Sequence, residues 1–334
     1  MACSIHPIVK DNPMKIQLIA ATIAVFLGAT SAQAETWNLS AEQPDANYLT
    51  QNVRQFAADV KAATKGQLDF NVQSNSVLLK RPEVKRGVQQ GIVPIGEFLM
   101  SALGNEDAMF EIDSVPFLAS SFDKSEKLWK AAREQIAQRL DKQGIVLVYG
   151  SPWPPQGIYT KTPVTTMEGF KGAKFRAYSA STSRMVTLMG AVPATIQTAE
   201  VPQAFATSVI DMMITSPATG VDTQAWDYVK YYYDAQAFIP QAIVIANKRA
   251  LAKLPADQRQ AVLDAGQRAE ARGWANAREL TSKLTQTLAS KGISVQAMPP
   301  QVAAELAKIG NTMTDEWSKK AGPDGAKVLE AFRR

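Results

Sequence analysis

The chain has 334 residues, a formal net charge of +5, and a single cysteine and a single histidine. Cys3 and His6 lie close to the N-terminus, so the rest of the chain offers no disulfide, thiol nucleophile, histidine triad or usual zinc or copper ligand. Basic residues are spread along the chain, except at Lys80–Arg86, where no aromatic residues are interleaved, and we therefore expect no nucleic-acid partner.

Residues 14–34 read MKIQLIAATIAVFLGATSAQA, with a short basic start, an apolar core and an A-x-A end. This pattern is typical of a secretory signal peptide. We expect cleavage after Ala34, with residues 1–34 forming an upstream extension and signal peptide that are removed. Loss of two lysines and one aspartate then lowers the formal net charge from +5 to +4. An exported protein without disulfides fits the periplasm.

Strand-like and helical patterns alternate through the first half of the exported chain. This order favours an α/β architecture with helices packed on a largely parallel sheet. The expected elements are a strand at 36–40, a helix at 44–66, a strand at 67–72, a short helix at 83–91, a short strand at 92–98, a helix at 125–144 and a buried strand at 145–150.

The segment SPWPPQG, residues 151–157, interrupts this pattern with three prolines and is the best candidate for a crossover between two domains. The alternation then restarts. The pattern from 256 to 290 predicts a helix of roughly 50 Å, which is long enough to brace two lobes. The other elements expected here are strands at 173–178, 209–214 and 241–248, and helices near 182–189 and at 199–208.

Arg176 is the first candidate for a binding residue. It lies in a predicted strand in which Phe175 and Ala177 point the opposite way, while Tyr178 shares its face. A guanidinium group is planar, always charged and offers paired donors that match a carboxylate. Arg176 is therefore a candidate anion-binding residue with Tyr178 as an aromatic wall. The alternative is a surface arginine at the end of a strand.

Three further positions follow strands or lie at the proposed crossover. Thr215 and Ser216 end an apolar strand, where ligands bind in open α/β sheets, although an ordinary polar turn is the alternative. Phe98 ends another strand, and Trp153 lies in the proline-rich connector. Both aromatic residues are candidates to line a cleft, with packing in the core as the alternative.

Signals for catalysis are weak. The chain has no G-x-S-x-G elbow, no P-loop and no G-x-G-x-x-G fingerprint. Glu97, Asp113 and Glu200 are carboxylates of the kind that glycosidases use in pairs, but nothing in the sequence pairs them. We expect no enzyme activity and no cofactor.

Several segments resemble the solute-binding proteins of TRAP (tripartite ATP-independent periplasmic) transporters. MEGFKGAKFRA is similar to the family's pEDLKGLKIRv segment, and LMGAVPATIQTAEVPQAFATSVIDMMITS resembles alGanpvpmpfsEvytALqtGvvDGqEnp. IDSVPFLASS and NVQSNSVLLKRPEVKRGVQQG also fit the family's first half. The resemblance covers roughly residues 36–320, and the segments occur in the family's order and spacing.

The resemblance implies two α/β lobes around a cleft, with a long bracing helix. Residues 35–154 plus about 242–281 would form lobe I, and 155–241 plus about 282–334 would form lobe II. Such a periplasmic receptor closes on a small organic acid and delivers it to the membrane permease subunits of the transporter, its only link to the inner membrane. The family's arginine that pairs with the ligand carboxylate falls on Arg176.

Departures from the family pattern suggest the kind of ligand. A second arginine common in the family is replaced near Gln156, and its usual asparagine falls on Thr215 or Ser216. An aromatic residue frequent in the family falls at Ala199. The resemblance places three residues of the other lobe near the site, namely Phe98, Glu42 and Arg81. With Trp153, Phe98 and Tyr178 supplying apolar bulk, we expect a 2-oxo or 2-hydroxy monocarboxylate with an apolar or aromatic body.

Two alternatives remain open at this point. One is a receptor that dimerises or senses a ligand without transport. The other is a periplasmic lyase or hydrolase that uses carboxylates or a metal held by oxygen ligands.

Overall fold

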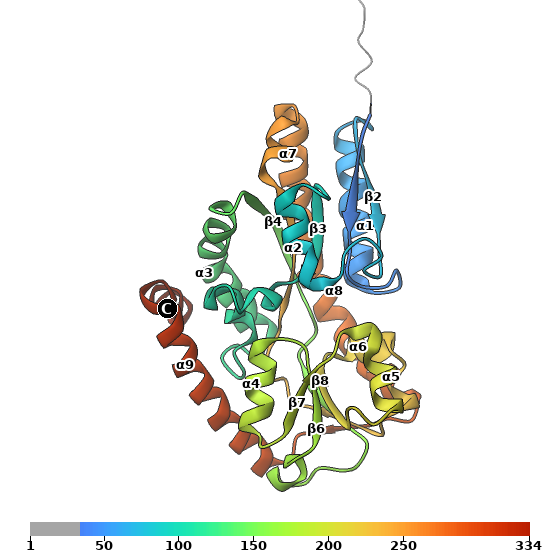
Figure 1. Cartoon of the computed structure of the whole chain (residues 1–334), viewed down its shortest axis with the longest axis vertical. Helices are drawn as coiled ribbons and strands as arrows, with labels where there is room; N and C mark the ends of the chain where they lie inside the picture. Colours follow the sequence, from blue (N-terminus) through green and yellow to red (C-terminus); the bar gives the residue numbers. More distant parts are fainter. Residues whose placement is uncertain (1–33) are drawn as a thin grey trace, which may run out of the picture. The chain divides into compact units, whose positions relative to one another are not determined.

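The computed structural model describes residues 34–334, so the expected signal peptide and upstream extension lie outside the described residues. The described part of the chain contains two β-sheets flanked by helices. Figure 1 shows one lobe containing α2, α3, β3 and β4 and another containing α4, α5, β6 and β8. No helix in residues 34–334 combines the length and apolar character of a membrane span.

The first lobe is built on a mixed sheet with the strand order β2-β1-β3-β10-β4. β1 pairs in parallel with β2 and β3, whereas β10 is antiparallel to β3 and β4. The strands are β1 (Glu35–Ser40), β2 (Leu68–Gln73), β3 (Ile95–Leu99), β4 (Ile145–Pro152) and β10 (Gln241–Asn247). The helices are α1 (Tyr48–Ala63), α2 (Arg81–Gln90), α3 (Phe122–Asp141) and α7 (Lys248–Lys253), with 3-10 turns η1 (Met100–Leu103) and η2 (Ala108–Ser114).

The second lobe is built on a mixed sheet with the order β11-β9-β5-β8-β6-β7. Its strands are β5 (Gly157–Thr160), β6 (Lys174–Ala177), β7 (Val192–Thr195), β8 (Met212–Thr215), β9 (Tyr231–Asp234) and β11 (Ser294–Ala297). Its helices are α4 (Ala180–Leu188), α5 (Val201–Ala206) and α6 (Pro217–Asp222), with 3-10 turns η3 (Met167–Phe170), η4 (Thr198–Glu200) and η5 (Ala225–Asp227). β6 lies between β7 and β8 and is parallel to both.

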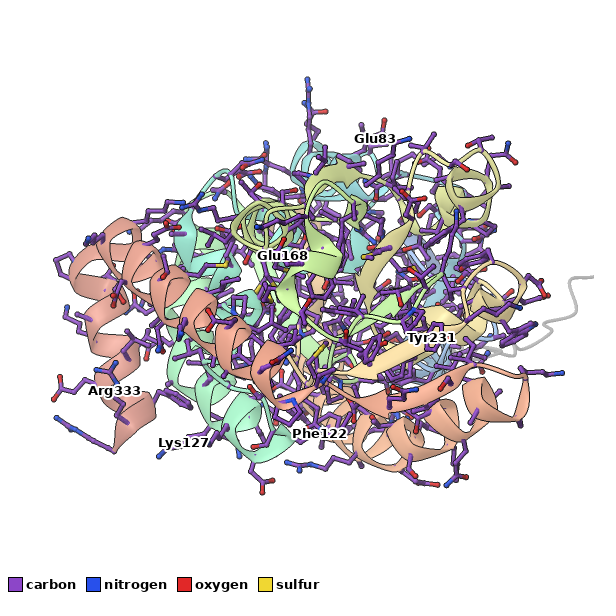
Figure 2. All side chains as sticks on the ribbon, turned by 90° about the horizontal axis from the view of Figure 1, so that it is seen from below. Glu83, Phe122, Lys127, Glu168, Tyr231 and Arg333 are labelled. Carbon is purple, nitrogen blue, oxygen red and sulfur yellow. The ribbon has the colours of Figure 1, made fainter. Side chains whose placement is uncertain are left out.

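Two short segments connect the sheets, 153–156 after β4 and 235–240 before β10, and the chain passes between the sheets a third time through the helical segment between β10 and β11. The long helix α8 (Ala256–Ser290) contacts α1 and β4 of the first lobe and α6 and β11 of the second. A second long helix, α9 (Pro300–Arg333), runs beside α4 and then α3 (Figure 1). Figure 2 labels Lys127 on α3 and Arg333 on α9, and side chains fill the space between these two helices.

The two-lobed α/β fold and its long bracing helix are confirmed. The largely parallel sheets are confirmed as well, because one strand in each sheet, β10 in the first and β5 in the second, runs antiparallel to its neighbours and the other strands share one direction. These two strands follow the crossover segments and so enter their sheets from the opposite lobe. The expected division assigned 282–334 to lobe II, yet Trp317, Val328 and Leu329 pack with the core of the first lobe.

Helix α8 approaches β4 closely because Gly266 has no side chain. A Cβ atom at Gly266 would meet the Cγ1 atom of Val148 at 2.8 Å and its carbonyl oxygen at 3.1 Å. The backbone oxygen cannot move aside as a flexible side chain can. A bulkier residue would therefore push the helix away from the sheet.

We predict that Gly266→Val lowers the free energy of unfolding by about 1–3 kcal/mol through overpacking. Ala271→Val is the matched control, because Ala271 is exposed on the same helix and its replacement costs only helix propensity, ~0.7 kcal/mol or less. Urea denaturation of both variants measures the difference. Equal stability of the two variants would contradict the close packing of α8 on β4.

Candidate ligand-binding site

A small cavity of about 270 Å³, the inner cavity, lies between the two lobes. Six of the nine residues proposed from the sequence line it. They are Arg81, Trp153, Gln156, Arg176, Tyr178 and Thr215. The remaining lining residues, which the sequence did not indicate, are Leu99, Thr198, Thr219 and Pro240.

Arg176 is the largest fully buried side chain in the described part of the chain, with 1 % of its surface exposed. Its Nε atom donates to the carbonyl of Ile196 at 3.0 Å and its Nη1 atom to that of Ile214 at 3.5 Å, which fixes the guanidinium plane. Within residues 34–334 it has no carboxylate partner. Burial, and then the nearby charge of Arg81, lower the pKa of Arg176 to about 10, so it remains a cation at neutral pH.

The start of helix α4 holds Tyr178 beside this guanidinium, 4.9 Å from the ring centre. Ser179 is the N-cap of α4, and the backbone amides of Tyr178 and Ser179 both donate to the hydroxyl of Thr182. The Tyr178 hydroxyl donates to the Gln156 side-chain oxygen at 2.8 Å, and the Gln156 amide donates to the carbonyl of Pro154. Tyr178 and Gln156 therefore form one fixed wall, in which the tyrosine oxygen is free to accept a further hydrogen bond.

Trp153 forms another wall of the inner cavity. Its backbone amide donates to the carbonyl of Pro240 at 2.8 Å, which joins the two crossover segments. Its indole ring packs edge-on against Tyr48, with ring centres 6.4 Å apart. The indole Nε1 atom is buried and has no hydrogen-bond partner within residues 34–334. Because an unpaired buried donor is costly, this N–H is available to a polar ligand atom.

The first lobe contributes Arg81, which is buried against Glu42. The Nε atom of Arg81 donates to the Oε1 atom of Glu42 at 2.7 Å, and its Nη2 atom donates to the same oxygen. The other Glu42 oxygen accepts from the backbone amide of Leu99 at 3.1 Å. Burial lowers the pKa of Arg81, but the Glu42 carboxylate outweighs this effect and raises it above the usual arginine value. The pair is therefore a buried salt bridge anchored to β3.

Glu97 lies behind this pair on β3. One of its oxygens accepts from the backbone amide of Glu42 at 2.9 Å, and the other is buried without a partner in the described part of the chain. Burial and the neighbouring Glu42 carboxylate raise the pKa of Glu97 to about 8. The side chain is thus mostly protonated at neutral pH.

The remaining proposed residues lie outside the inner cavity. Phe98 is fully buried in the core of the first lobe, because side chains alternate along β3 and Leu99 faces the cavity instead. Ser216 is the N-cap of α6 and accepts from the backbone amide of Thr219. Glu42 lies behind Arg81 and lines a neighbouring cavity.

This neighbouring cavity, the outer cavity, measures about 1230 Å³ and is also bordered by both lobes. Arg81 and Thr198 line both cavities, and the Nη2 atom of Arg81 reaches the Thr198 hydroxyl at 3.5 Å. Asn47, the N-cap of α1, donates to the Asp222 carboxylate of α6 at 2.6 Å and so links the lobes at this side. Arg81 and Thr198 therefore separate the inner cavity from the outer one.

The inner cavity has the chemistry of an anion-binding site. Arg176, Arg81 and the indole N–H of Trp153 provide donors, while the threonine hydroxyls and Tyr178 provide acceptors. Residues 34–334 contain no group of three or more histidine, cysteine or acidic side chains placed to hold a metal ion.

Two α/β lobes that enclose a small, donor-rich cavity define the class of two-lobed solute-binding proteins. Residues 39–320 match the model of the bacterial extracellular solute-binding protein family 7. The chain belongs to this family, whose members are extracytoplasmic receptors of TRAP transporters and not enzymes. These receptors bind small organic acids and work with membrane permease components.

Solved structures of the same class are closely similar. DctP7 of Bordetella pertussis, an extracytoplasmic solute receptor binding pyroglutamic acid, is 72% identical, with a TM-score of 0.89 over 90% of this chain and 100% of that chain. DctP6 of the same species, also binding pyroglutamic acid, is 39% identical, with a TM-score of 0.88 over 90% of this chain and 99% of that one. A marine metagenome TRAP solute-binding protein specific for pyroglutamate is 34% identical, with the same TM-score and coverage.

The protonated state of Glu97 gives a prediction for stability. The ordinary pKa of this carboxyl group is 4.5 and its folded value is about 8, so unfolding releases a proton between these pH values. Rising pH therefore favours unfolding of the wild type over this range. Glutamine has no such proton. We predict that the free energy of unfolding of Glu97→Gln, relative to the wild type, increases as the pH rises from about 5 to 8.

Urea denaturation of both proteins at several pH values measures this difference. Parallel pH profiles for the two proteins would show that Glu97 is ionised in the folded state.

Proposed function

We propose that this receptor binds pyroglutamate and that Arg176 pairs with its carboxylate. The observation that carries the proposal is a fully buried cation in the inner cavity with no carboxylate partner within residues 34–334. An uncompensated buried charge is strongly unfavourable, so the site requires an anion. The 72% identity to a pyroglutamic acid receptor supports this ligand in particular.

The remaining groups of the inner cavity fit the rest of pyroglutamate. The molecule is a compact monocarboxylate whose single ring carries a lactam C=O and N–H. The unpaired indole N–H of Trp153 suits the lactam oxygen, and the Tyr178 and threonine oxygens suit the lactam N–H. The apolar sides of the ring would lie against Leu99 and Pro240. The proposal keeps the expected monocarboxylate with an apolar body and replaces the 2-oxo or 2-hydroxy group by a lactam.

We further propose that binding closes two lobes that meet along the inner cavity. The crossovers at 153–156 and 235–240 would act as the pivot, and the C-terminal part of α9, which packs on the core of the first lobe, would move with that lobe. The closed receptor would deliver its ligand to the permease subunits of a TRAP transporter. Export by the signal peptide of residues 14–34 would bring the receptor to the periplasm.

Thermal denaturation of residues 35–334, freed of co-purified ligand, tests the ligand. We predict that pyroglutamate raises the melting temperature, with about 2.7 kcal/mol of stabilisation at one hundred times its dissociation constant. Comparison compounds are aromatic and branched 2-oxo acids, 2-hydroxy acids, dicarboxylates and sugar acids. If a compound of one of these classes raises the melting temperature more than pyroglutamate does, that class and not pyroglutamate is the ligand.

Replacement of Arg176 tests the proposed contact between its guanidinium group and the ligand carboxylate. Removing one partner of a buried charge pair costs about 2–5 kcal/mol, so we predict that Arg176→Ala weakens pyroglutamate binding by roughly thirty-fold to several thousand-fold. Arg176→Lys should also bind poorly, because an ammonium group lacks the paired donors of a guanidinium.

Lys174→Ala is the matched control, because Lys174 is an exposed cation on the same strand and its loss should leave the affinity unchanged. Isothermal titration calorimetry measures all three variants. Full affinity in Arg176→Ala would remove Arg176 from the site.

A further inference from the structure

Arg81 occupies a position that helix stability does not explain. It is the first residue of α2, and the N-terminus of a helix disfavours a positive charge. Its side chain is nevertheless buried, whereas Glu83, two residues later, lies exposed at the surface (Figure 2). Because the helix dipole disfavours this buried cation, its placement at the N-terminus of α2 indicates a role in the neighbouring inner cavity.

The inner cavity brings two arginines together from different lobes. Arg81 belongs to α2 of the first lobe and Arg176 to β6 of the second, and both line the cavity. The Nη1 atom of Arg81 is buried and has no partner within residues 34–334. The positive charge of Arg81 lowers the pKa of Arg176, in keeping with the place of both side chains in one cavity.

Glu42 cancels one of these two charges. It accepts hydrogen bonds from Arg81, from the Gln43 side chain at 2.8 Å and from the Leu99 amide at 3.1 Å, so its position is fixed. Glu97 adds no charge at neutral pH, because burial raises its pKa to about 8. Tyr178 and Tyr228, which also act on Arg176, have raised pKa values and are neutral. One net positive charge remains in the cavity.

We propose that the Glu42–Arg81 pair makes the receptor select singly charged anions over dianions of similar size. This inference rests on the proposed function, because it concerns the same cavity and a monocarboxylate ligand. A monoanion neutralises the cavity when the lobes close on it. A dianion leaves a buried negative charge and a neutral molecule leaves a buried positive one, and both are unfavourable.

Isothermal titration calorimetry at pH 7 with two probes of similar size, L-pyroglutamate and succinate, tests the inference. Glu42→Gln keeps the side-chain shape and adds one positive charge to the cavity. It should raise the affinity for succinate relative to pyroglutamate by at least about tenfold. The double variant Arg81→Gln/Glu42→Gln restores the original net charge, so its affinity ratio should return to within about threefold of the wild-type value.

The inference is overturned if Glu42→Gln has the wild-type ratio of succinate to pyroglutamate affinity. It is also overturned if the double variant has the same ratio as Glu42→Gln. A purely structural role of the pair predicts this second outcome, because the double variant is altered more than the single one and would not regain the wild-type ratio. A wild-type protein that binds no pyroglutamate contradicts the proposed function instead.

The wild type alone provides a second measurement that needs no folded variant. Succinamate has the skeleton of succinate and one charge fewer. It should displace pyroglutamate at a concentration at least about tenfold lower than succinate does. Displacement by succinamate that is no better than displacement by succinate overturns the inference.

Discussion

The burial of Arg176 is the constraint on which the binding site depends. A guanidinium group removed from water needs both a fixed geometry and a compensating charge. The carbonyls of Ile196 and Ile214 supply the geometry, since the Arg176 strand lies between the two segments that carry them. In the proposed function that charge comes from the bound molecule, because no carboxylate of residues 34–334 is hydrogen-bonded to Arg176. The central strands of the second lobe thus hold a cation whose pairing depends on the ligand.

The first lobe contributes two opposite charges to the site, the guanidinium of Arg81 and the carboxylate of Glu42, and not a single charge. Arg81 would repel Arg176 if it stood alone, and Glu42 reduces this repulsion while remaining fixed by the backbone of β3. Glu97 lies behind them and stays protonated because the site is buried. The charge of the cavity is therefore set by residues far apart in the sequence, which meet only in the folded chain.

Arg176 and Tyr178 were predicted from strand alternation and a local motif, and both line the inner cavity, because such signals depend only on nearby residues. It misplaced Phe98 by one residue, since the exact register of β3 decides which neighbour faces the cavity. Thr198 and Pro240 gave no local signal, because tertiary packing alone brings them to the site. The short strands β7 and β11 and the antiparallel direction of β10 also depend on tertiary pairing. Gly322 and Pro323 interrupt the helical pattern of α9.

Trp153 and Pro240 both line the inner cavity, and a backbone hydrogen bond joins the crossover segments that carry them. In the proposed closing motion these two residues lie at the pivot, where points move least, and would keep their separation while the outer ends of the lobes move apart. An open receptor would thus retain one rigid face of its site. A ligand would first contact this unmoved face. The groups that move on closure, Arg81 above all, would then determine the rate at which the ligand dissociates.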